Sequence, residues 1–352
     1  MEEATPVTTS SALQTAVTDA LDTIDQERER EIISRRFGLF DRRETLEQIG
    51  EMLGITRERV RQLEKAILIR LKIATEEGRI PSTADVERAI IRDLAENGRV
   101  GRIHDVSHRL VGETDAAKHK PHIAFLSELS PKLTVVNEND NYHHAVGISE
   151  HGNEKDFKKR VDELVKTIKQ HGEPIHTDQL HAKTDYEHPK HVSGLASVSK
   201  HLATLNEHWG LNKWPTVNPK NIRDKIFVIL SEAGKPMHFS DIAKAIKQSD
   251  FKRKNVTTQA IHNELIKDKR FVLIGRGIYA LDSWGYSRGT VSDIITEVLR
   301  EAGEPLHRDD IVRRVLKKRQ VKETTILLNL QSKPEFKRVA KATYTLADDT
   351  KA

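Results

Sequence analysis

The apolar residues near the start of the chain recur every three or four positions, which is the spacing of one helix face. They predict two helices, with the apolar faces Leu13, Val17, Leu21, Ile24 and Ile32, Ile33, Phe37. The second helix should end near Gly38, because glycine is a common residue at helix C-termini. Residues 1–12 are small and polar, and we expect a disordered lead-in there.

Two further helices follow, separated by a short turn. Thr45 opens the first, whose apolar residues are Leu46, Ile49 and Leu53, and Gly54 ends it. Thr56 caps the second, which should run to about Ala74 with Val60, Leu63, Ile67 and Leu71 inside. A helix, a short turn with glycine and a second helix form the pattern of a helix-turn-helix.

Beyond residue 80 the same apolar pattern occurs four times. Each copy has a helix that ends at a glycine, with leucine or isoleucine four and eight positions earlier; the glycines are Gly98, Gly172, Gly234 and Gly303. In the last three copies a residue suited to capping a second helix lies six positions later, namely Asp178, Ser240 and Asp309. The long spacing suits tandem small domains better than a solenoid.

Each copy should also end in a β-hairpin. The predicted strand pairs are 133–136 with 142–146, 270–274 with 278–281, and 336–339 with 342–346; the second copy, at 209–217, has the weakest pattern. Three helices followed by a hairpin describe a winged helix. We therefore predict a mainly α fold with small β-hairpins, in which a helix-turn-helix domain precedes tandem winged-helix domains. The predicted segments are 1–12, 13–76, 82–148, 155–218, 220–286 and 289–348.

Composition narrows the class of protein. The chain has no cysteine, which excludes disulfides, thiolate metal sites and cysteine nucleophiles. It has no apolar run of the roughly twenty residues that a membrane span needs, and its first residues lack the apolar core of a signal peptide. We expect a cytoplasmic protein without a membrane partner.

Charge is unevenly distributed along the chain. The net charge is only +5, but residues 1–31 are acidic, whereas 220–282 and 304–341 are rich in lysine and arginine. A basic C-terminal half suggests contact with phosphate, although lysine-rich helices are often simply solvated.

The first part of the chain resembles region 4 of the sigma-70 family of transcription factors. Residues 25–38, DQEREREIISRRFG, resemble the first part of that region, and residues 45–65, TLEQIGEMLGITRERVRQLEK, resemble its second part closely. The resemblance implies a promoter reader for a -35-type element of double-stranded DNA. It also implies contact with RNA polymerase, and leaves open whether residues 21–37 dock on the polymerase β-flap.

Four residues of the second helix are the candidates for reading bases: Arg57, Glu58, Arg61 and Gln62. Arginine is suited to guanine, glutamate to cytosine and glutamine to adenine. Thr45, Thr56, Arg59 and Lys65 are the candidates for phosphate contact, which positions a protein on DNA without reading its sequence. The alternative is that Arg57, Glu58 and Arg61 only form ion pairs within a solvated helix face.

An ordinary sigma factor has an aromatic-rich melting region upstream of region 4. Here about twenty-five residues precede the match and none is aromatic. We therefore expect a protein that does not act alone as a sigma factor.

The third and fourth copies resemble the HARE-type helix-turn-helix domain, which is also found in the polymerase delta subunit. The residues that carry this resemblance lie in 222–243 and 270–284, and again in 302–312 and 344–346. The candidate DNA contacts are Lys252, Arg253, Lys254, Thr257, Thr258, Gln259, Arg276, Lys317, Lys318, Arg319, Lys322 and Lys341. A protein-binding spacer with a solvated basic face is the alternative, and the delta-subunit resemblance favours polymerase contact.

Histidine recurs four positions after the glycine in three copies, at His176, His238 and His307. These residues belong to separate copies, so we expect them to pack at the start of the second helix rather than to bind metal. His188 and His191, near Asp185, are a weaker metal candidate.

Sequence motifs of enzymes are absent: there is no phosphate-binding Walker loop, no HExxH and no nucleophile elbow. We expect no enzyme activity, no cofactor and no small-molecule substrate. The leading hypothesis is a sequence-specific transcription protein. The alternatives are a polymerase accessory or chromosome-organising protein, and, with the least support, a component of a nuclease or restriction system.

Overall fold

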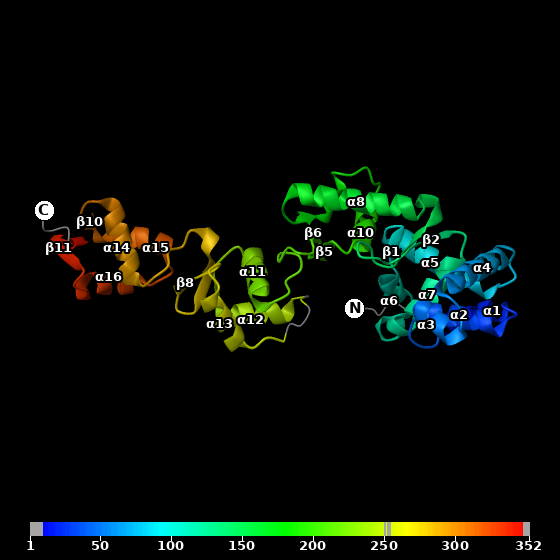
Figure 1. Ribbon diagram of the computed structural model, residues 1–352. Helices are drawn as coiled ribbons and strands as arrows, with labels where there is room; N and C mark the ends of the chain where they lie inside the picture. The colour runs from blue at the N-terminus through cyan, green and yellow to red at the C-terminus, as the bar shows by residue number, and fades with distance from the viewer. Residues whose placement is uncertain (1–9, 250, 252–254, 348–352) are drawn as a thin grey trace. The chain divides into compact units, whose positions relative to one another are not determined.

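The computed structural model describes residues 10–249, 251 and 255–347. These residues form a mainly helical fold with small antiparallel sheets of three strands, which confirms the predicted mainly α fold with small β-hairpins (Figure 1). The chain divides into two compact units, residues 1–213 and 214–352.

The N-terminal part of the first unit consists of four helices: α1 (Ser10–Asp22), α2 (Glu27–Phe37), α3 (Leu46–Leu53) and α4 (Arg57–Glu76). They lie where the apolar spacing predicts helices, but α1 begins at Ser10, so residues 10–12 are helical and not part of the predicted disordered lead-in. α2 ends at Gly38 in the left-handed conformation, with φ +71°. α4 has 20 residues and is the longest of the four.

The four predicted copies share one topology: a helix, a short strand, two helices and a hairpin. The first copy is α5 (Ser82–Asn97), β1 (Val100–Arg102), α6 (Ile103–Val111), α7 (Glu113–Leu129), β2 (Leu133–Val136) and β3 (Ala145–Ile148). The second is α8 (Glu154–His171), β4 (Ile175–His176), α9 (Thr177–His181), α10 (Pro189–Val198), β5 (Leu202–Leu205) and β6 (His208–Leu211).

The third and fourth copies belong to the second unit. The third is α11 (Ile222–Ala233), β7 (Met237–His238), α12 (Phe239–Gln248), α13 (Thr258–Lys267), β8 (Phe271–Gly275) and β9 (Ile278–Leu281). The fourth is α14 (Val291–Ala302), β10 (Leu306–His307), α15 (Arg308–Lys318), α16 (Glu323–Ser332), β11 (Phe336–Ala340) and β12 (Thr343–Leu346).

In each copy the short strand pairs with the last strand of the hairpin, giving the orders β1-β3-β2, β4-β6-β5, β7-β9-β8 and β10-β12-β11. The sequence did not predict these short strands, because two or three residues carry no detectable alternation. The hairpin of the second copy was predicted too late: it spans 202–211 rather than 209–217.

The predicted caps of the second helices were wrong by two residues. His176, His238 and His307 are the N-caps, and each ring Nδ1 accepts the backbone N–H of Asp178, Ser240 or Asp309, at 3.3, 3.3 and 3.4 Å. An imidazole nitrogen reaches the exposed N–H of the first turn as an Asp or Ser oxygen would. The repeated histidine therefore begins a helix, as expected from its position in separate copies.

α1, α2 and α4 share one hydrophobic core with the first copy, whereas the buried Ile49 of α3 belongs to a separate small cluster. Apolar residues of α1, including Leu13 and Val17, are buried together with Ile90 of α5 and Phe125 of α7. α4 enters two cores: its N-terminal half supplies Val60 to a small cluster beneath the helix-turn-helix, and its C-terminal half supplies Ile67, Leu71 and Ala74 to the shared core.

α7 is buried on most of its surface. It packs against α6 of its own copy and against α1, α2 and α4. Its Phe125 ring contacts the Phe37 ring edge to face, with centroids 5.2 Å apart. A helix that is apolar on all sides is typical of a position inside a core, and α7 occupies such a position.

Two histidines of α7 form a buried hydrogen-bond chain to the helix-turn-helix segment. The Nε2–H of His122 donates to the Leu39 carbonyl at 2.8 Å, because a carbonyl can only accept. The Nδ1 of His122 is then an acceptor, and the Nδ1–H of His119 donates to it at 2.9 Å. The chain holds both rings neutral and leaves Nε2 of His119 buried without a protein partner in the described residues.

α10 of the second copy packs against β1 of the first. The backbones approach so closely that a Cβ on Gly194 would lie 2.6 Å from the Val100 carbonyl oxygen and 2.9 Å from that of Gly98. Glycine is therefore required at 194 to bring the two copies into contact.

The buried histidines predict a pH dependence of stability. Burial lowers the pKa of His119 and His122, and lowers that of His144, with help from Arg43 and Lys120, to about 4. The unfolded chain thus binds more protons below pH ~6.5. We expect the free energy of unfolding of the first unit to fall between pH 7 and 5, by about 2 kcal/mol from His144 alone.

This fall can be measured by urea denaturation at a series of pH values. His119→Leu and His144→Leu should flatten the profile, whereas His208→Gln, at an exposed position, should not. A first unit equally stable at pH 7 and 5 would contradict the prediction.

Gly194→Ala tests the joint between the first two copies. The added methyl must displace backbone atoms, so we expect the first unit to lose about 1–3 kcal/mol in chemical denaturation. Ser193→Ala, one residue earlier, serves as the control and should change stability by less than about 0.5 kcal/mol. Equal stabilities for the two variants would contradict the observed packing.

Candidate nucleic-acid interface

The helix-turn-helix is held by hydrogen bonds at the ends of its two helices. Thr45 and Gln48 form a capping box: the backbone N–H of Gln48 donates to Thr45 Oγ1 at 3.2 Å, and that of Thr45 donates to Gln48 Oε1 at 2.9 Å. Gly54 ends α3 with φ +64°. Thr56 then caps α4 by accepting the backbone N–H of Arg59 at 3.2 Å. These contacts fix where α4 begins.

A small core lies directly beneath the turn. Ile32 of α2, Ile49 of α3 and Val60 of α4 are fully buried there, with Leu53 and Leu63 packed around them. Three helices that meet in one cluster set the angle between α3 and α4. This packing fixes the position of the N-terminal half of α4 and leaves its opposite face exposed to solvent.

The four predicted base-reading residues lie together on the exposed face of this half of α4. Glu58 is the centre of their contacts: Arg61 donates to its two carboxylate oxygens at 2.9 and 2.7 Å, and Gln62 donates to it at 3.3 Å. Arg57 pairs instead with Glu47 of α3, at 2.8 Å. The structure thus contains one ion pair within α4 that the alternative interpretation expects, Arg61 with Glu58, whereas Arg57 pairs outside its own helix.

These ion pairs are compatible with DNA binding. The side chains of Arg61 and Glu58 are 55% and 58% exposed, so the pair is solvated and worth little to stability. The hydrogen bonds from Arg61 hold the pKa of Glu58 below its ordinary value, so Glu58 stays an acceptor at neutral pH. On binding DNA, each side chain could exchange its partner in the pair for a base edge at a small cost in free energy. In the free protein the pairs hold the side chains in place.

The predicted phosphate contacts have two different roles in the free protein. The hydroxyls of Thr45 and Thr56 accept helix N–H groups, as caps. Arg59 is exposed and reaches only Gln62, at 3.5 Å, and Lys65 is exposed one turn further along. The two cations lie beside the base-reading face.

An ion pair and a hydrogen bond that the sequence did not reveal fix α2 against the helix-turn-helix. Arg36 pairs with Glu64 of α4 at 3.1 Å, and Arg28 donates to the Leu53 carbonyl at 2.7 Å. Both partners are more than twenty residues away in sequence, and no local pattern could have indicated them.

The third helix of each copy is the predicted DNA-contacting element, and the four are not equally accessible. α7 and α10 are packed against the preceding part of the chain. α13 and α16 pack mainly within their own copies, and each buries only two residues: Ile261 and Leu265, and Ile326 and Leu330. Among the described residues, the accessible third helices are those of the third and fourth copies.

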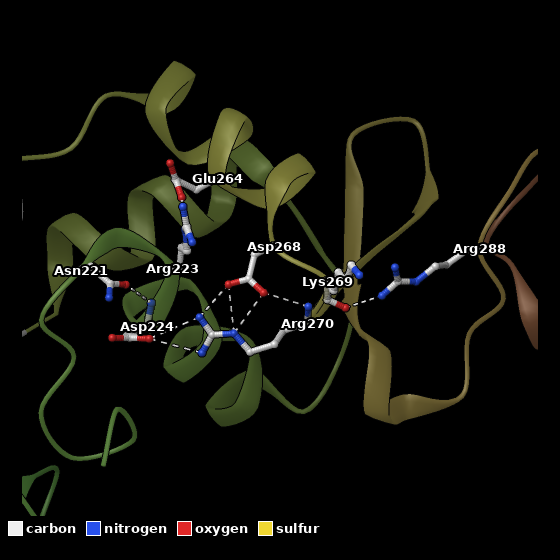
Figure 2. A network of polar contacts seen from close by, with 8 residues as sticks. All are labelled: Asn221, Arg223, Asp224, Glu264, Asp268, Lys269, Arg270 and Arg288. Carbon is white, nitrogen blue, oxygen red and sulfur yellow. Dashed lines mark hydrogen bonds and ion pairs between the residues drawn. The ribbon is translucent and has the colours of Figure 1, made fainter. Parts of the chain in front are cut away.

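In the third copy an ion-pair network fixes the wing to the helices. Figure 2 shows Arg270, at the start of the hairpin, between Asp268 and Asp224. Its guanidinium lies 2.7 Å from Asp268 and 3.3 Å from Asp224, which is almost fully buried on α11. Arg223 pairs with Glu264 of α13 nearby. The wing and α13 are thus held to α11 by charges.

The candidate contacts of the third copy lie around the start of α13 and at the tip of the wing. Thr257 caps α13 by accepting the backbone N–H of Ala260 at 3.2 Å, and Thr258 and Gln259 follow in the first turn. Arg276 is exposed between β8 and β9. Lys252, Arg253 and Lys254 lie outside the described residues.

In the fourth copy two of the candidate cations are used inside the protein. Lys318 lies 3.0 Å from Glu297 and 2.8 Å from Glu301, both on α14. Arg319 donates to the carbonyls of Leu273 and Gly289, and burial lowers its pKa. Lys317, Lys322 and Lys341 are exposed.

The structure gives no support to a metal site. His188 caps α10, and its ring centroid is 6.1 Å from that of His191. In the described part of the chain, three or more histidine or carboxylate residues do not gather in a way that could hold a metal ion. Among the same residues, every helix is too short or too polar to cross a membrane.

Comparison with known proteins relates the N-terminal part of the chain to a family of transcription factors. The family Sigma-70, region 4 matches residues 20–72. The chain is similar to the RNA polymerase sigma factor SigA of a Bacillus species, with 46% identity over 61 residues, which are 17% of this chain and 16% of that protein. No solved structure matches.

The helix-turn-helix at residues 20–72 is of the region 4 type. The segment that matches the family includes α2, α3 and the N-terminal half of α4, where the four predicted base-reading residues lie. They support a sigma-factor-like, DNA-binding role in transcription for this part, and neither indicates an enzyme. The chain spans about a sixth of the relative, and the activity of the whole sigma factor does not transfer to it.

The different surroundings of Lys318 and Lys341 give a paired prediction. Lys318→Ala removes two contacts between α15 and α14 and should lower the free energy of unfolding of the second unit by about 1 kcal/mol, without changing affinity for DNA. Lys341→Ala should leave stability unchanged. If the wing tip contacts phosphate, this variant should also reduce the slope of the logarithm of the DNA-binding constant against the logarithm of salt concentration by about one. Denaturation and binding at several salt concentrations distinguish the two effects, and the reverse pattern would contradict the assignment.

Proposed function

We propose that this chain is a DNA-binding transcription protein that reads a -35-type promoter element through α4 and contacts RNA polymerase. The observation that carries the proposal is the exposed group Arg57, Glu58, Arg61 and Gln62, on the first two turns of a helix whose start is fixed by Thr56. The N-terminal part of the second helix of a helix-turn-helix is what enters the major groove. Region 4 similarity over the same residues supports this.

The four copies are proposed to be winged helices, of the HARE type in the third and fourth. Their shared α-β-α-α-β-β topology with a three-stranded sheet supports the first part of this proposal. The packing of α7 and α10 favours a structural role for the first two copies. In this proposal the third and fourth copies make the salt-dependent contact with DNA. The residues involved include Thr257, Arg276, Lys322 and Lys341.

Contact with polymerase would use a surface other than the apolar faces of α1 and α2. Those faces pack against α5 and α7 in the shared core, and they contain Leu13, Val17 and Ile33. A β-flap interaction of the kind found in the family would therefore need different side chains here.

A polymerase accessory or chromosome-organising protein is the second candidate. The specific observation that favours it is that α13 and α16 expose large apolar side chains, Ile266 at 65% and Leu328 at 63%. Exposed apolar residues on an accessible helix suit protein contact better than contact with phosphate.

Selection from a random pool of double-stranded DNA tests the reading function. The full chain should enrich one motif, and Arg61→Ala and Gln62→Ala should each weaken binding to it by about 1–3 kcal/mol, with relaxed preference at one base position. Arg88→Ala, an exposed arginine of α5, is the matched control and should bind as the parent does. Enrichment that is unchanged in the Arg61 and Gln62 variants would refute reading by α4. Polymerase capture without an enriched motif would support the second candidate.

A further inference from the structure

A pocket lies between the helix-turn-helix part and the first copy. Its volume is ≈ 350 Å³, and its wall comes from the end of α2, the loop before α3, the middle of α4, one side of α7 and the β2–β3 loop. A volume of this size can enclose a small organic molecule. None of the residues predicted to contact DNA lines it.

One end of the pocket has unmatched positive charge. Arg43, Lys120 and His144 line this end, and both cations are near enough to His144 to lower its pKa. Arg43 Nε donates to the Arg36 carbonyl at 3.2 Å, and among the described residues no carboxylate forms an ion pair with Arg43, Lys120 or His144. The two neighbouring acids are already paired: Glu138 with Lys200 at 2.9 Å, and Glu64 with Arg36 at 3.1 Å. An anion at this end would find two cations and an imidazole N–H.

The opposite end has an unmatched carboxyl group. Glu128 lies on α7 eight residues after Lys120, hence about 12 Å further along the helix. It is half-buried and has no hydrogen-bond or ion-pair partner among the described residues. Burial raises its pKa, and this effect is larger than the opposing effect of the nearby Lys72. A hydrogen-bond donor of a ligand would satisfy it.

Apolar side chains also line the pocket: Phe37 of α2, Leu68 of α4 and Ala124 of α7. Ala124 lies between Lys120 and Glu128 on α7, and so between the two ends. A flat ring system would cover these side chains and remove them from water. Along α7 the pocket therefore offers a site for an anion near Lys120, an apolar surface near Ala124 and a hydrogen-bond acceptor at Glu128.

We propose that this pocket binds a small organic phosphate with a flat, donor-bearing ring system, of the purine mononucleotide class. The phosphate lies against Arg43, Lys120 and His144, and the ring lies over Phe37 and Leu68. The edge of the base donates to Glu128. Guanine offers two adjacent N–H donors to one carboxylate and adenine offers a single amino group, so guanine is preferred. The site is independent of the DNA-reading face and of the proposed function.

Calorimetric titration of the full chain with guanosine 5′-monophosphate, without DNA, tests the proposal. We expect one saturable site for each chain. Adenosine 5′-monophosphate should bind more weakly, and guanosine without phosphate should bind at least tenfold more weakly. Arg43→Ala and Lys120→Met should each weaken binding about tenfold or more, which corresponds to about 1.4 kcal/mol. Glu128→Gln should remove the preference for guanine.

Lys169→Ala, an exposed lysine of α8, is the control and should bind as the parent does. Thermal melts identify any variant that fails to fold. Because both Arg43→Ala and Lys120→Met alter the cationic end, the test remains decisive if one of them does not fold. The proposal is overturned if neither mononucleotide binds at about 1 mM. It is also overturned if guanosine binds as tightly as its phosphate, or if both folded variants bind as the parent does. DNA selection is carried out separately, so failure here leaves the promoter-reading proposal unaffected.

Discussion

The burial of α7 on both of its sides is the interaction on which the first unit depends. One side of α7 completes the first copy by packing on α6, and the other covers α1, α2 and the second half of α4. α7 can do this because its buried positions are mostly small and apolar, and because the buried rings of His119 and His122 share a hydrogen bond. Without α7, the apolar faces of three helices would meet water.

This constraint also explains why four copies of one topology serve different purposes. In the first two copies the third helix forms a joint with the preceding part of the chain, through Phe125 and through Gly194. In the last two copies it is accessible, and charged networks such as that of Arg270 hold the wing in place. A shared fold therefore does not imply a shared role, and the role is decided by what each third helix contacts.

The sequence was sufficient to predict the features that depend on neighbouring residues. Helical spacing and the capping residues Thr45 and Thr56 gave the helix-turn-helix, and the exposed reading face followed from the same periodicity. The alternating runs gave three of the four hairpins. The second hairpin was misplaced because its strands, with His208 and Gly210, lack a clear alternation.

Features that depend on distant residues could not be predicted. These features involve contacts between segments that are far apart in the chain. Examples are the burial of α7, the ion pair of Arg36 with Glu64, and the ion pairs that Lys318 forms with α14. A basic residue in a sequence can equally face solvent, DNA or a carboxylate on another helix. Only the tertiary structure distinguishes these cases.

The double role of α4 has a consequence for how this protein could have arisen. The family similarity ends at residue 72, inside α4, yet the core into which that helix continues extends to Ile148. The segment that matches the family and the unit that shares one core therefore have different boundaries. The region 4-like segment is not an independent folding unit in this chain, because the second half of α4 belongs to the core of the first copy. Its loss or exchange would require the neighbour to change as well.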